Sequence, residues 1–293
     1  MLQRQLGTTG LSVSALGFGA GAIGDLSISD DHATRVVHAA LDHGVTLIDT
    51  ARSYGASEDR IARAIEGRRN RVILSTKVGY GIEGAADWSY ESVSRGIDEA
   101  LAKLKTGHID IVHLHSCSEE VLRAGEATRA LNDAVHAGKV RVAAYSGDNN
   151  ALDEAALSSA FGSIELSVNP WDEEAIDHIL WRAKDRGLGV IAKRPLANAW
   201  WRHEARPDRA DVATYWERGK RLGLPSFGMS PDALSIRFTV YTWGVDSAIV
   251  GTTRPESFGA LALAIEEGPL PDPVREHIRS AWRNKMAGAR GVV

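Results

Sequence analysis

Cysteine is nearly absent from this sequence: 293 residues include one, Cys117, so no disulfide can form within the chain. Long apolar runs are also missing, and no stretch reaches the roughly 18 residues that a membrane-spanning helix needs. The first ten residues, MLQRQLGTTG, lack the basic region and apolar core of a signal peptide. Positive charge is not in excess, because the formal net charge is −4. We therefore expect a cytoplasmic protein that binds neither nucleic acid nor membranes.

Nothing in the sequence marks a domain boundary, since it contains no internal repeats, low-complexity segments or linker. Apolar residues make up 44% and charged residues 25%, the balance of an ordinary soluble protein. The length suits one large α/β barrel. We therefore expect a single domain over residues 1–293, and no sequence feature indicates an oligomeric state.

Short apolar runs alternate with longer amphipathic stretches. The candidate strands are residues 13–19, 45–49, 71–77, 109–115, 140–146, 163–169, 189–194 and 247–251. Strands that alternate with helices predict parallel pairing, and eight such units favour an α/β fold of the (β/α)8 TIM barrel type over an open sheet. The glycines of GFGAGAIG (17–24) approach a dinucleotide-binding motif, but the next N-cap candidates, Ser29 and Asp31, come too late for it. We interpret these glycines as a loop of close approach at the barrel mouth.

The segments between the strands indicate how the barrel is covered and closed. Residues 30–44 and 89–108 have the apolar spacing of amphipathic helices, and Ser89 is a good N-cap. The stretch RQLGTTGLSV (4–13) predicts an N-terminal β-hairpin that caps the end of the barrel away from the strand C-termini. Residues 196–227 form a long irregular loop after strand seven, which we expect to lie over the C-terminal face.

Three successive candidate strands end in ionisable residues, Asp49, Lys77 and His115, and Tyr54 follows in the loop after Asp49. In a barrel all four would lie at the C-terminal face, where barrel enzymes keep their chemistry. A tyrosine pKa of about 10 is too high for an efficient acid at neutral pH, and a nearby ammonium lowers it. Asp49 would keep Lys77 charged, and His115 would donate a hydrogen bond to a carbonyl. These side chains predict proton delivery to a carbonyl oxygen, which leaves the hydride to a cofactor.

The segments DTARSYG, STKVG and DIVHLH resemble, in this order, the three catalytic segments of the aldo-keto reductase family. The resemblance runs from RQLGTTGLSVSALGFGAGAIG to IVGTTRPES, nearly the whole chain. It implies a (β/α)8 enzyme that reduces aldehydes or ketones, small-molecule carbonyl substrates, with a nicotinamide cofactor. By this match Tyr54 is the general acid, Lys77 and Asp49 tune it, and His115 orients the carbonyl.

The strand ends that hold the nicotinamide carboxamide depart from the family pattern. The fifth strand usually ends in Ser-Asn, and here it reads Ser146-Gly147. The lost amide has two candidate replacements just downstream, Asn149 and Asn150. The sixth strand usually supplies a Gln, for which this chain offers Ser167 or Asn169. We favour Asn169, because it is nearest to the strand end.

After strand seven the family often has YSPL, and this chain has KRPL. The resemblance assigns the whole stretch to the cofactor: Lys193, Arg194, Pro195 and Leu196. A guanidinium at Arg194 would stack on the nicotinamide or grip the pyrophosphate with two hydrogen bonds. The alternative for Arg194 is an ion pair at the barrel rim.

The loop after strand eight, GTTRPES, precedes a helix, and this position is the natural phosphate site of a (β/α)8 barrel. The phosphate-binding candidates are Gly251, Thr252 and Thr253. The resemblance indicates that Arg254 binds a ribose 2′-phosphate, and we therefore expect NADPH to be preferred over NADH. Ser257 stands where the family has a further basic residue. Gly19 and Ala20, after strand one, complete the expected cofactor site.

Two other functional classes stay open. Residues two apart in a strand face the same way, so His113 and His115 both point into the barrel. Some metal-dependent barrel hydrolases begin their metal site with such a pair, although strands five to eight offer no further histidine, and we favour a buried, hydrogen-bonded His113 with no metal. The other alternative is a non-catalytic, cofactor-sensing protein. Four tryptophans are candidate substrate walls, or else packing residues, and they favour an apolar or planar ligand: Trp88, Trp171, Trp200 and Trp201.

Overall fold

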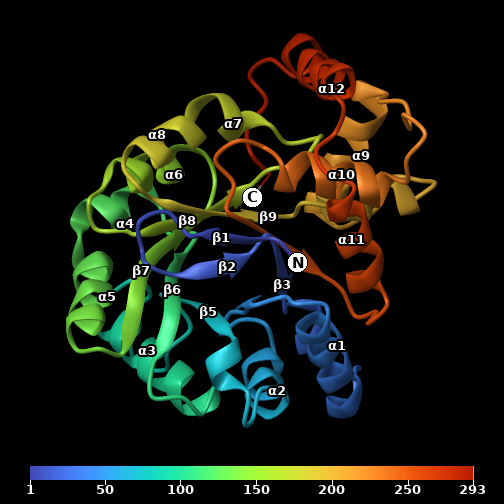
Figure 1. Cartoon of the computed structure of the whole chain (residues 1–293). Helices are drawn as coiled ribbons and strands as arrows, with labels where there is room; N and C mark the ends of the chain where they lie inside the picture. The colour runs from blue at the N-terminus through green and yellow to red at the C-terminus, as the bar shows by residue number, and fades with distance from the viewer. Residues whose placement is uncertain (293) are drawn as a thin grey trace.

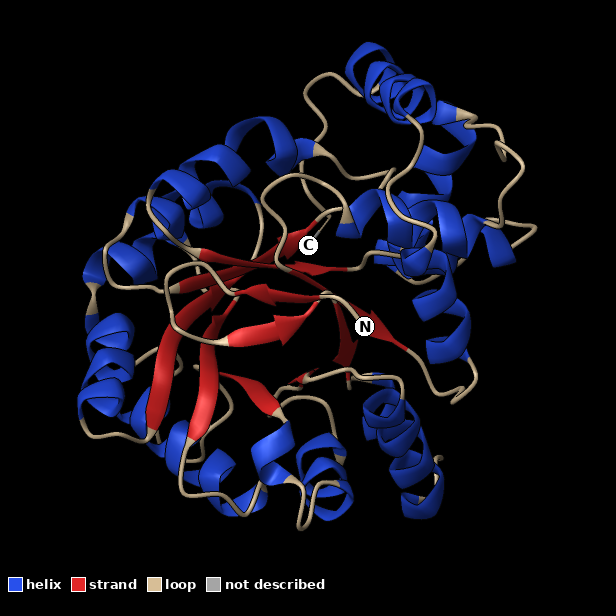
Figure 2. Cartoon of the chain, in the orientation of Figure 1, coloured by secondary structure: helices blue, strands red, loops and turns tan. Residues whose placement is uncertain are grey.

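Eight parallel strands close into a barrel, which confirms the predicted fold. The computed structural model describes residues 1–292. In this range the strands follow the order β10-β3-β4-β5-β6-β7-β8-β9 around the barrel, and helices surround them (Figures 1 and 2). The barrel strands are β3 (Leu16–Gly19), β4 (Leu47–Asp49), β5 (Ile73–Val78), β6 (Ile109–His115), β7 (Val140–Ser146), β8 (Ser163–Ser167), β9 (Gly189–Lys193) and β10 (Ser247–Gly251). Because the strands are parallel, their carboxyl ends meet at one face.

The inside of the barrel is apolar at its lower level. Leu47, Ile111, Ile191 and Ile249 lie there in one buried cluster, none more than 6% exposed. Side chains in a strand alternate between its two faces, so the residues two positions later also point inward, at the level above. Those residues are Asp49, His113, Lys193 and Gly251. The upper level therefore carries the chemistry, over an apolar base.

An N-terminal hairpin caps the lower end of the barrel, as predicted. It consists of β1 (Gln3–Gln5) and β2 (Ser12–Ser14), paired antiparallel, and it lies across the strands in Figure 1. Leu6 fits under the barrel against Gly189, where a Cβ would lie 2.4 Å from Leu6 Cγ. The predicted strand 13–19 is wrong as one element. It divides at Ala15 into β2 of the hairpin and β3 of the barrel.

Helices cover the outside of the barrel. They are α1 (Asp30–Asp42), α2 (Ser57–Ala64), α3 (Tyr90–Lys103), α4 (Glu119–Ala124), α5 (Glu126–His136), α6 (Asn149–Leu157), α7 (Glu174–His178), α8 (Leu180–Asp185), α9 (Ala210–Leu222), α10 (Pro231–Val240), α11 (Ser257–Glu266) and α12 (Asp272–Lys285), with short 3-10 turns η1 (Ala22–Gly24), η2 (Arg69–Arg71) and η3 (Ala197–Arg202). Ser89 caps α3 as predicted, because its Oγ accepts a hydrogen bond from the backbone N–H of Ser92 at 3.1 Å. Among the helices of residues 1–292, none combines the length and apolar character that crossing a bilayer requires.

The segment 196–227 is more regular than the sequence predicted. It contains η3 and the 13-residue helix α9, so the expectation of a long irregular loop is wrong. Tyr215 and Leu222, seven residues apart on α9, are buried on one helical face. The segment does lie over the C-terminal face, since Asn198, Arg202 and Arg209 line the cavity there.

Candidate active site

A cavity of about 1080 Å³ opens at the carboxyl ends of the barrel strands. Its floor includes Asp49, Tyr54, His115, Ser146 and Glu165. Its walls come from the loops that follow β3, β6, β7, β9 and β10. The strand ends that the sequence singled out therefore meet in one place, and three members of the predicted group of four border the same space. Lys77, the fourth, is 1% exposed and lies beneath Tyr54.

Glycines fix the loop that carries Tyr54. A Cβ at Gly24 would lie 1.7 Å from the Tyr54 carbonyl oxygen, and a Cβ at Gly21 would lie 3.5 Å from its ring. The Gly24 carbonyl also accepts a hydrogen bond from the N–H of Ala56 at 3.0 Å. The loop after β3 thus presses against the Tyr54 turn, and the interpretation of these glycines as residues of close approach is confirmed.

Below Tyr54, a buried hydrogen-bonded chain links Lys77 to His113. The Lys77 ammonium donates to Asp49 Oδ2 and, at 3.0 Å, to the Thr50 carbonyl. Ser75 Oγ donates to Asp49 Oδ1 at 2.8 Å. Because the Ser75 proton is used there, His113 Nε2, 3.1 Å from Ser75 Oγ, carries its own proton and donates it. His113 is therefore the buried, hydrogen-bonded histidine that the sequence analysis favoured.

Glu165 is the residue that the sequence analysis missed. It is 2% exposed, and its Oε1 accepts a hydrogen bond from Ser146 Oγ at 3.1 Å. Its Oε2 lies 3.5 Å from Lys77 Nζ and 3.7 Å from His113 Nε2. The available signal was the alternation in β8, where Ser163, Glu165 and Ser167 share one face and the apolar Ile164 and Leu166 occupy the other.

Two carboxylates around one ammonium set the proton affinities of the site. Burial, and then repulsion from Glu165, raise the pKa of Asp49 to about 7. Lys77 lowers the pKa of Tyr54, but burial and the carboxylates of Asp49 and Glu165 raise it by more, so that it lies above the ordinary value of 10. The expected lowering of the Tyr54 pKa is therefore wrong. The phenol is protonated at neutral pH, which is the form that donates a proton.

His115 is held between two tyrosines. Its ring meets that of Tyr54 edge-on at 6.0 Å and stacks on that of Tyr80 at 5.6 Å. Tyr80, a second residue that the sequence analysis missed, places its hydroxyl 3.0 Å from His115 Nδ1. Burial, and then the Lys77 charge, lower the pKa of His115 to about 3, so the imidazole is neutral. Tyr80 stands three residues after Lys77, where the sequence alone gave no pattern to mark it.

Most of the predicted cofactor residues border the cavity. Ten do so: Gly19, Ser146, Lys193, Arg194, Pro195, Leu196, Gly251, Thr252, Arg254 and Ser257. Ala20, Asn169 and Thr253 are outside the lining that the described residues form. The Asn169 amide is used elsewhere, since its Nδ2 donates to the Arg194 carbonyl at 3.0 Å and its Oδ1 accepts from the N–H of Trp171 at 2.9 Å. Glu165 borders the cavity on that strand instead.

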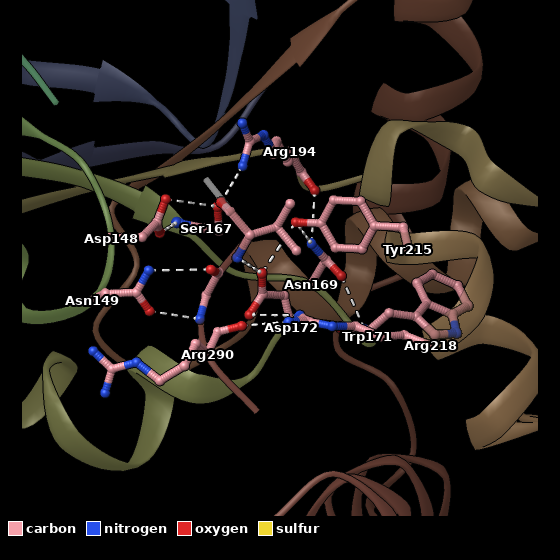
Figure 3. A network of polar contacts seen from close by, with 12 residues as sticks. Asp148, Asn149, Ser167, Asn169, Trp171, Asp172, Arg194, Tyr215, Arg218 and Arg290 are labelled. Carbon is pink, nitrogen blue, oxygen red and sulfur yellow. Dashed lines mark hydrogen bonds and ion pairs between the residues drawn. The ribbon is translucent and has the colours of Figure 1, made fainter. Parts of the chain in front are cut away.

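Residues 291–292, near the C-terminus, are hydrogen-bonded beside the cavity, and one of them contacts the arginine of KRPL (Figure 3). The Arg194 guanidinium donates to the Val292 carbonyl. Asn149 holds Gly291 through both backbone groups, accepting at 2.9 Å and donating at 3.2 Å. Lys193, the other basic residue of KRPL, pairs with Asp148 at 2.8 Å. Both cations of KRPL thus have partners within the chain. For Arg194 the partner is a backbone carbonyl, and not the carboxylate of the rim ion pair that the sequence analysis allowed.

The other end of the cavity has the features of a phosphate site. Thr252 Oγ1 lies 3.2 Å from Ser257 Oγ, at the first residue of α11, and accepts from the N–H of Arg254 at 3.0 Å. The Arg254 side chain is exposed and forms no ion pair with any residue in 1–292. A helix N-terminus with hydroxyls and an unpaired guanidinium suits an anionic group.

The four candidate tryptophans do not line the cavity that the described residues form. Trp171, Trp200 and Trp201 pack on one another, with ring centres 5.3 to 6.2 Å apart. Trp88 packs behind Tyr80, with ring centres 5.5 Å apart. All four are therefore packing residues in this structure, which was the alternative that the sequence left open.

One group of metal-ligand type lies within the described part of the chain, namely Asp49, His113 and Glu165. The Lys77 ammonium contacts Asp49 and lies 3.5 Å from Glu165, so a cation already stands between the two carboxylates. His115, which a hydrolase metal site would need, faces Tyr80 instead.

A tyrosine thus lies above a buried lysine–aspartate pair at the C-terminal mouth of a (β/α)8 barrel, an arrangement that suits proton transfer. The chain belongs to the aldo/keto reductase family, because residues 15–283 match the sequence model of that family. It is therefore an oxidoreductase of the family that acts on small carbonyl compounds with a nicotinamide cofactor. The residues present fit such a cofactor, since Glu165 Oε2 has no hydrogen-bond partner among residues 1–292 and Arg254 is free at the far end.

Individual relatives agree with this assignment. The chain is 27% identical over 281 residues to L-galactose dehydrogenase of Arabidopsis thaliana, covering 90% of this chain and 88% of that protein. It is 33% identical over 208 residues to 6-dehydroglucose reductase of Novosphingobium aromaticivorans, covering 66% and 68%. The holo structure of aldo-keto reductase AKR11C1 from Bacillus halodurans superimposes with a TM-score of 0.84 at 25% identity, covering 96% of each chain.

Proposed function

We propose that this protein interconverts a carbonyl compound and its alcohol with NADPH or NADH, and that Tyr54 is the general acid for reduction. The observation that carries the proposal is the Lys77 ammonium, which lies 5.4 Å from the centre of the Tyr54 ring at the floor of the cavity. A cation at this place stabilises the phenolate that remains once the proton has left. When bound, the nicotinamide supplies the hydride.

The proton path uses this chain's own groups. Tyr54 gives its proton to the carbonyl oxygen, Lys77 stabilises the phenolate, and Asp49 keeps Lys77 charged. His115 is neutral and offers one N–H. In the tautomer in which Tyr80 donates to Nδ1, that proton sits on Nε2, where it orients the carbonyl. Tyr80 is therefore a positioning residue for His115.

We also propose that NADPH is preferred over NADH. The support is Arg254, an exposed guanidinium with no partner in the described chain, beside the hydroxyls of Thr252 and Ser257. Guanidinium groups bind phosphate through paired charge-assisted hydrogen bonds. The extra 2′-phosphate of NADPH is the group that such a side chain would distinguish.

The substrate that fits the cavity is polar and hydroxylated rather than apolar. The tryptophans are packed elsewhere, and the walls carry hydrogen-bonding groups: Glu119, Asn150, Asn198, Arg202 and Asp232. Such groups match a polyhydroxy carbonyl compound better than an aromatic one. The names of two relatives, L-galactose dehydrogenase and 6-dehydroglucose reductase, point to sugars as well.

A turnover assay tests the proposal. Purified protein with NADPH should reduce hydroxylated aldehydes or ketones faster than apolar aromatic ones, and a strong chelator should leave the rate unchanged. Tight cofactor binding without turnover on a broad panel would favour the cofactor-sensing alternative. Activity that a chelator abolishes and zinc restores would favour the metal-dependent hydrolase.

A further inference from the structure

Glu165 lines the cavity, and one oxygen of its buried carboxylate has no hydrogen bond among residues 1–292. Glu165 Oε1 accepts from Ser146 Oγ, but Oε2 has no hydrogen-bond partner in the described structure. The nearest cations lie too far from Oε2 for good hydrogen bonds, Lys77 Nζ at 3.5 Å and His113 Nε2 at 3.7 Å. A buried acceptor without a donor costs free energy, so a donor from a bound molecule is expected at this place.

The charges around Glu165 do not balance either. Lys77 is the one ammonium in the group, and it faces two carboxylates, Asp49 and Glu165. His113 is neutral near pH 7, because burial lowers its pKa to about 4. Lys193 borders the same cavity, but it pairs with Asp148 at 2.8 Å. Above about pH 7 the described side chains of this group therefore carry one excess negative charge, which a cationic ligand would neutralise.

We propose that Glu165 selects the oxidised form of the nicotinamide cofactor over the reduced form. The inference rests on the proposed function, because it takes the ligand of the cavity to be a nicotinamide. The carboxamide N–H group, present in both forms, would donate to Oε2. The ring is positively charged when oxidised and neutral when reduced, so only the oxidised form offsets the excess charge.

This selectivity has a chemical consequence. At an effective dielectric constant of about 20, the attraction between one carboxylate and one cationic ring within the same cavity would change a binding ratio by roughly tenfold or more. A carboxylate that stabilises the positive charge left by hydride loss would make the bound, reduced cofactor a stronger hydride donor to the carbonyl. Glu165 would therefore favour reduction within the site, while slow release of the oxidised cofactor would make turnover sensitive to inhibition by that form.

Direct binding measurements at pH 8.5 test the proposal without turnover. Dissociation constants are measured by calorimetry for NADP+ and NADPH, and again for NAD+ and NADH. Wild-type protein should bind the oxidised member of each pair more tightly. Glu165→Gln has the same shape and can still pair with the carboxamide, and it should lose roughly tenfold of this preference, mainly through weaker binding of the oxidised form. Glu165→Asp, which keeps the charge, should retain most of it.

The control variant is Glu120→Gln, which removes the same charge from an exposed residue at the edge of the cavity and should leave the ratio unchanged. A Glu165→Gln ratio equal to that of wild type overturns the inference while the proposed function stands. If wild-type protein binds neither form, the proposed function fails with it. If Glu165→Gln does not fold, the ratio of the two dissociation constants in wild-type protein tests the inference. Tighter binding of the reduced form than of the oxidised form would overturn it.

Discussion

The Lys77 ammonium lies 5.4 Å from the centre of the Tyr54 ring and is fully enclosed beneath it. Tyr54→Phe keeps this packing and removes only the phenolic proton. We expect carbonyl reduction to fall by roughly 10²-fold or more while cofactor affinity holds. Steady-state rates and a cofactor titration of the same preparation measure both quantities. A variant with near wild-type turnover would remove Tyr54 from the role of acid.

Arg254 should decide between the two cofactors. Arg254→Ala removes an exposed guanidinium that supports no other described contact, so the fold should not change. We expect NADPH binding to weaken roughly tenfold to a hundredfold, the equivalent of one charge-assisted hydrogen bond of about 1.5–3 kcal/mol, with little change for NADH. Titrations with both cofactors give the comparison. Equal weakening would assign Arg254 to the shared pyrophosphate.

Arg194 should affect stability more than cofactor binding, because its guanidinium contacts the Val292 carbonyl. Arg194→Ser should lower the thermal unfolding midpoint and leave the NADH and NADPH affinities in place. Arg194→Lys should recover part of the lost stability, since an ammonium cannot reproduce the planar fork. Parallel weakening of both cofactors, reduced at high salt, would instead show that Arg194 reaches the pyrophosphate, as the sequence suggested.

His113 should make the fold sensitive to acid. Its pKa is about 4 when folded, because of burial, against 6.5 as the ordinary value. The unfolded chain therefore binds the extra proton first, and the stability that neutral His113 contributes is present above pH 6.5 and is lost as pH falls towards 4. The difference corresponds to about 3 kcal/mol.

Urea unfolding of wild type and His113→Gln from pH 7 to pH 4 isolates this contribution. Gln keeps a side-chain N–H for Ser75 but does not titrate, and the opposing contribution of Asp49 is common to both proteins. The stability of wild type relative to the variant should fall steadily across this range. A constant difference would mean that His113 does not titrate as its burial requires.

The barrel strands and the four predicted catalytic residues were predictable because both follow from the local alternation of apolar and polar residues. A strand with one face towards the barrel interior places residues two apart at successive levels, so Asp49, Lys77 and His115 could be assigned to the mouth from their positions alone. The break at Ala15 could not, since apolar residues continue through it and only the tertiary contacts of the hairpin divide the run.

The carboxamide candidate Asn169, just after β8, shows what local reasoning could not foresee. Asn169 was favoured as nearest to the strand end, but β8 ends at Ser167 and the chain then turns, with Asn169 bridged to Asp172. The Asn169 amide donates to the Arg194 carbonyl, and Asn169 is outside the cavity lining that the described residues form. Glu165, deeper in the strand, was passed over because its role depends on Lys77 and Ser146 from two other strands.

The N-terminal hairpin links the start of the chain to its far end. Arg4 donates to the carbonyls of Val240 and Val245 at 2.7 and 2.9 Å, and the N–H of Gly7 donates to Asp246 at 3.2 Å. During synthesis on the ribosome these partners emerge more than two hundred residues after the hairpin. The hairpin is therefore among the last elements to reach its final contacts, and the base of the barrel stays open until β10 has been translated.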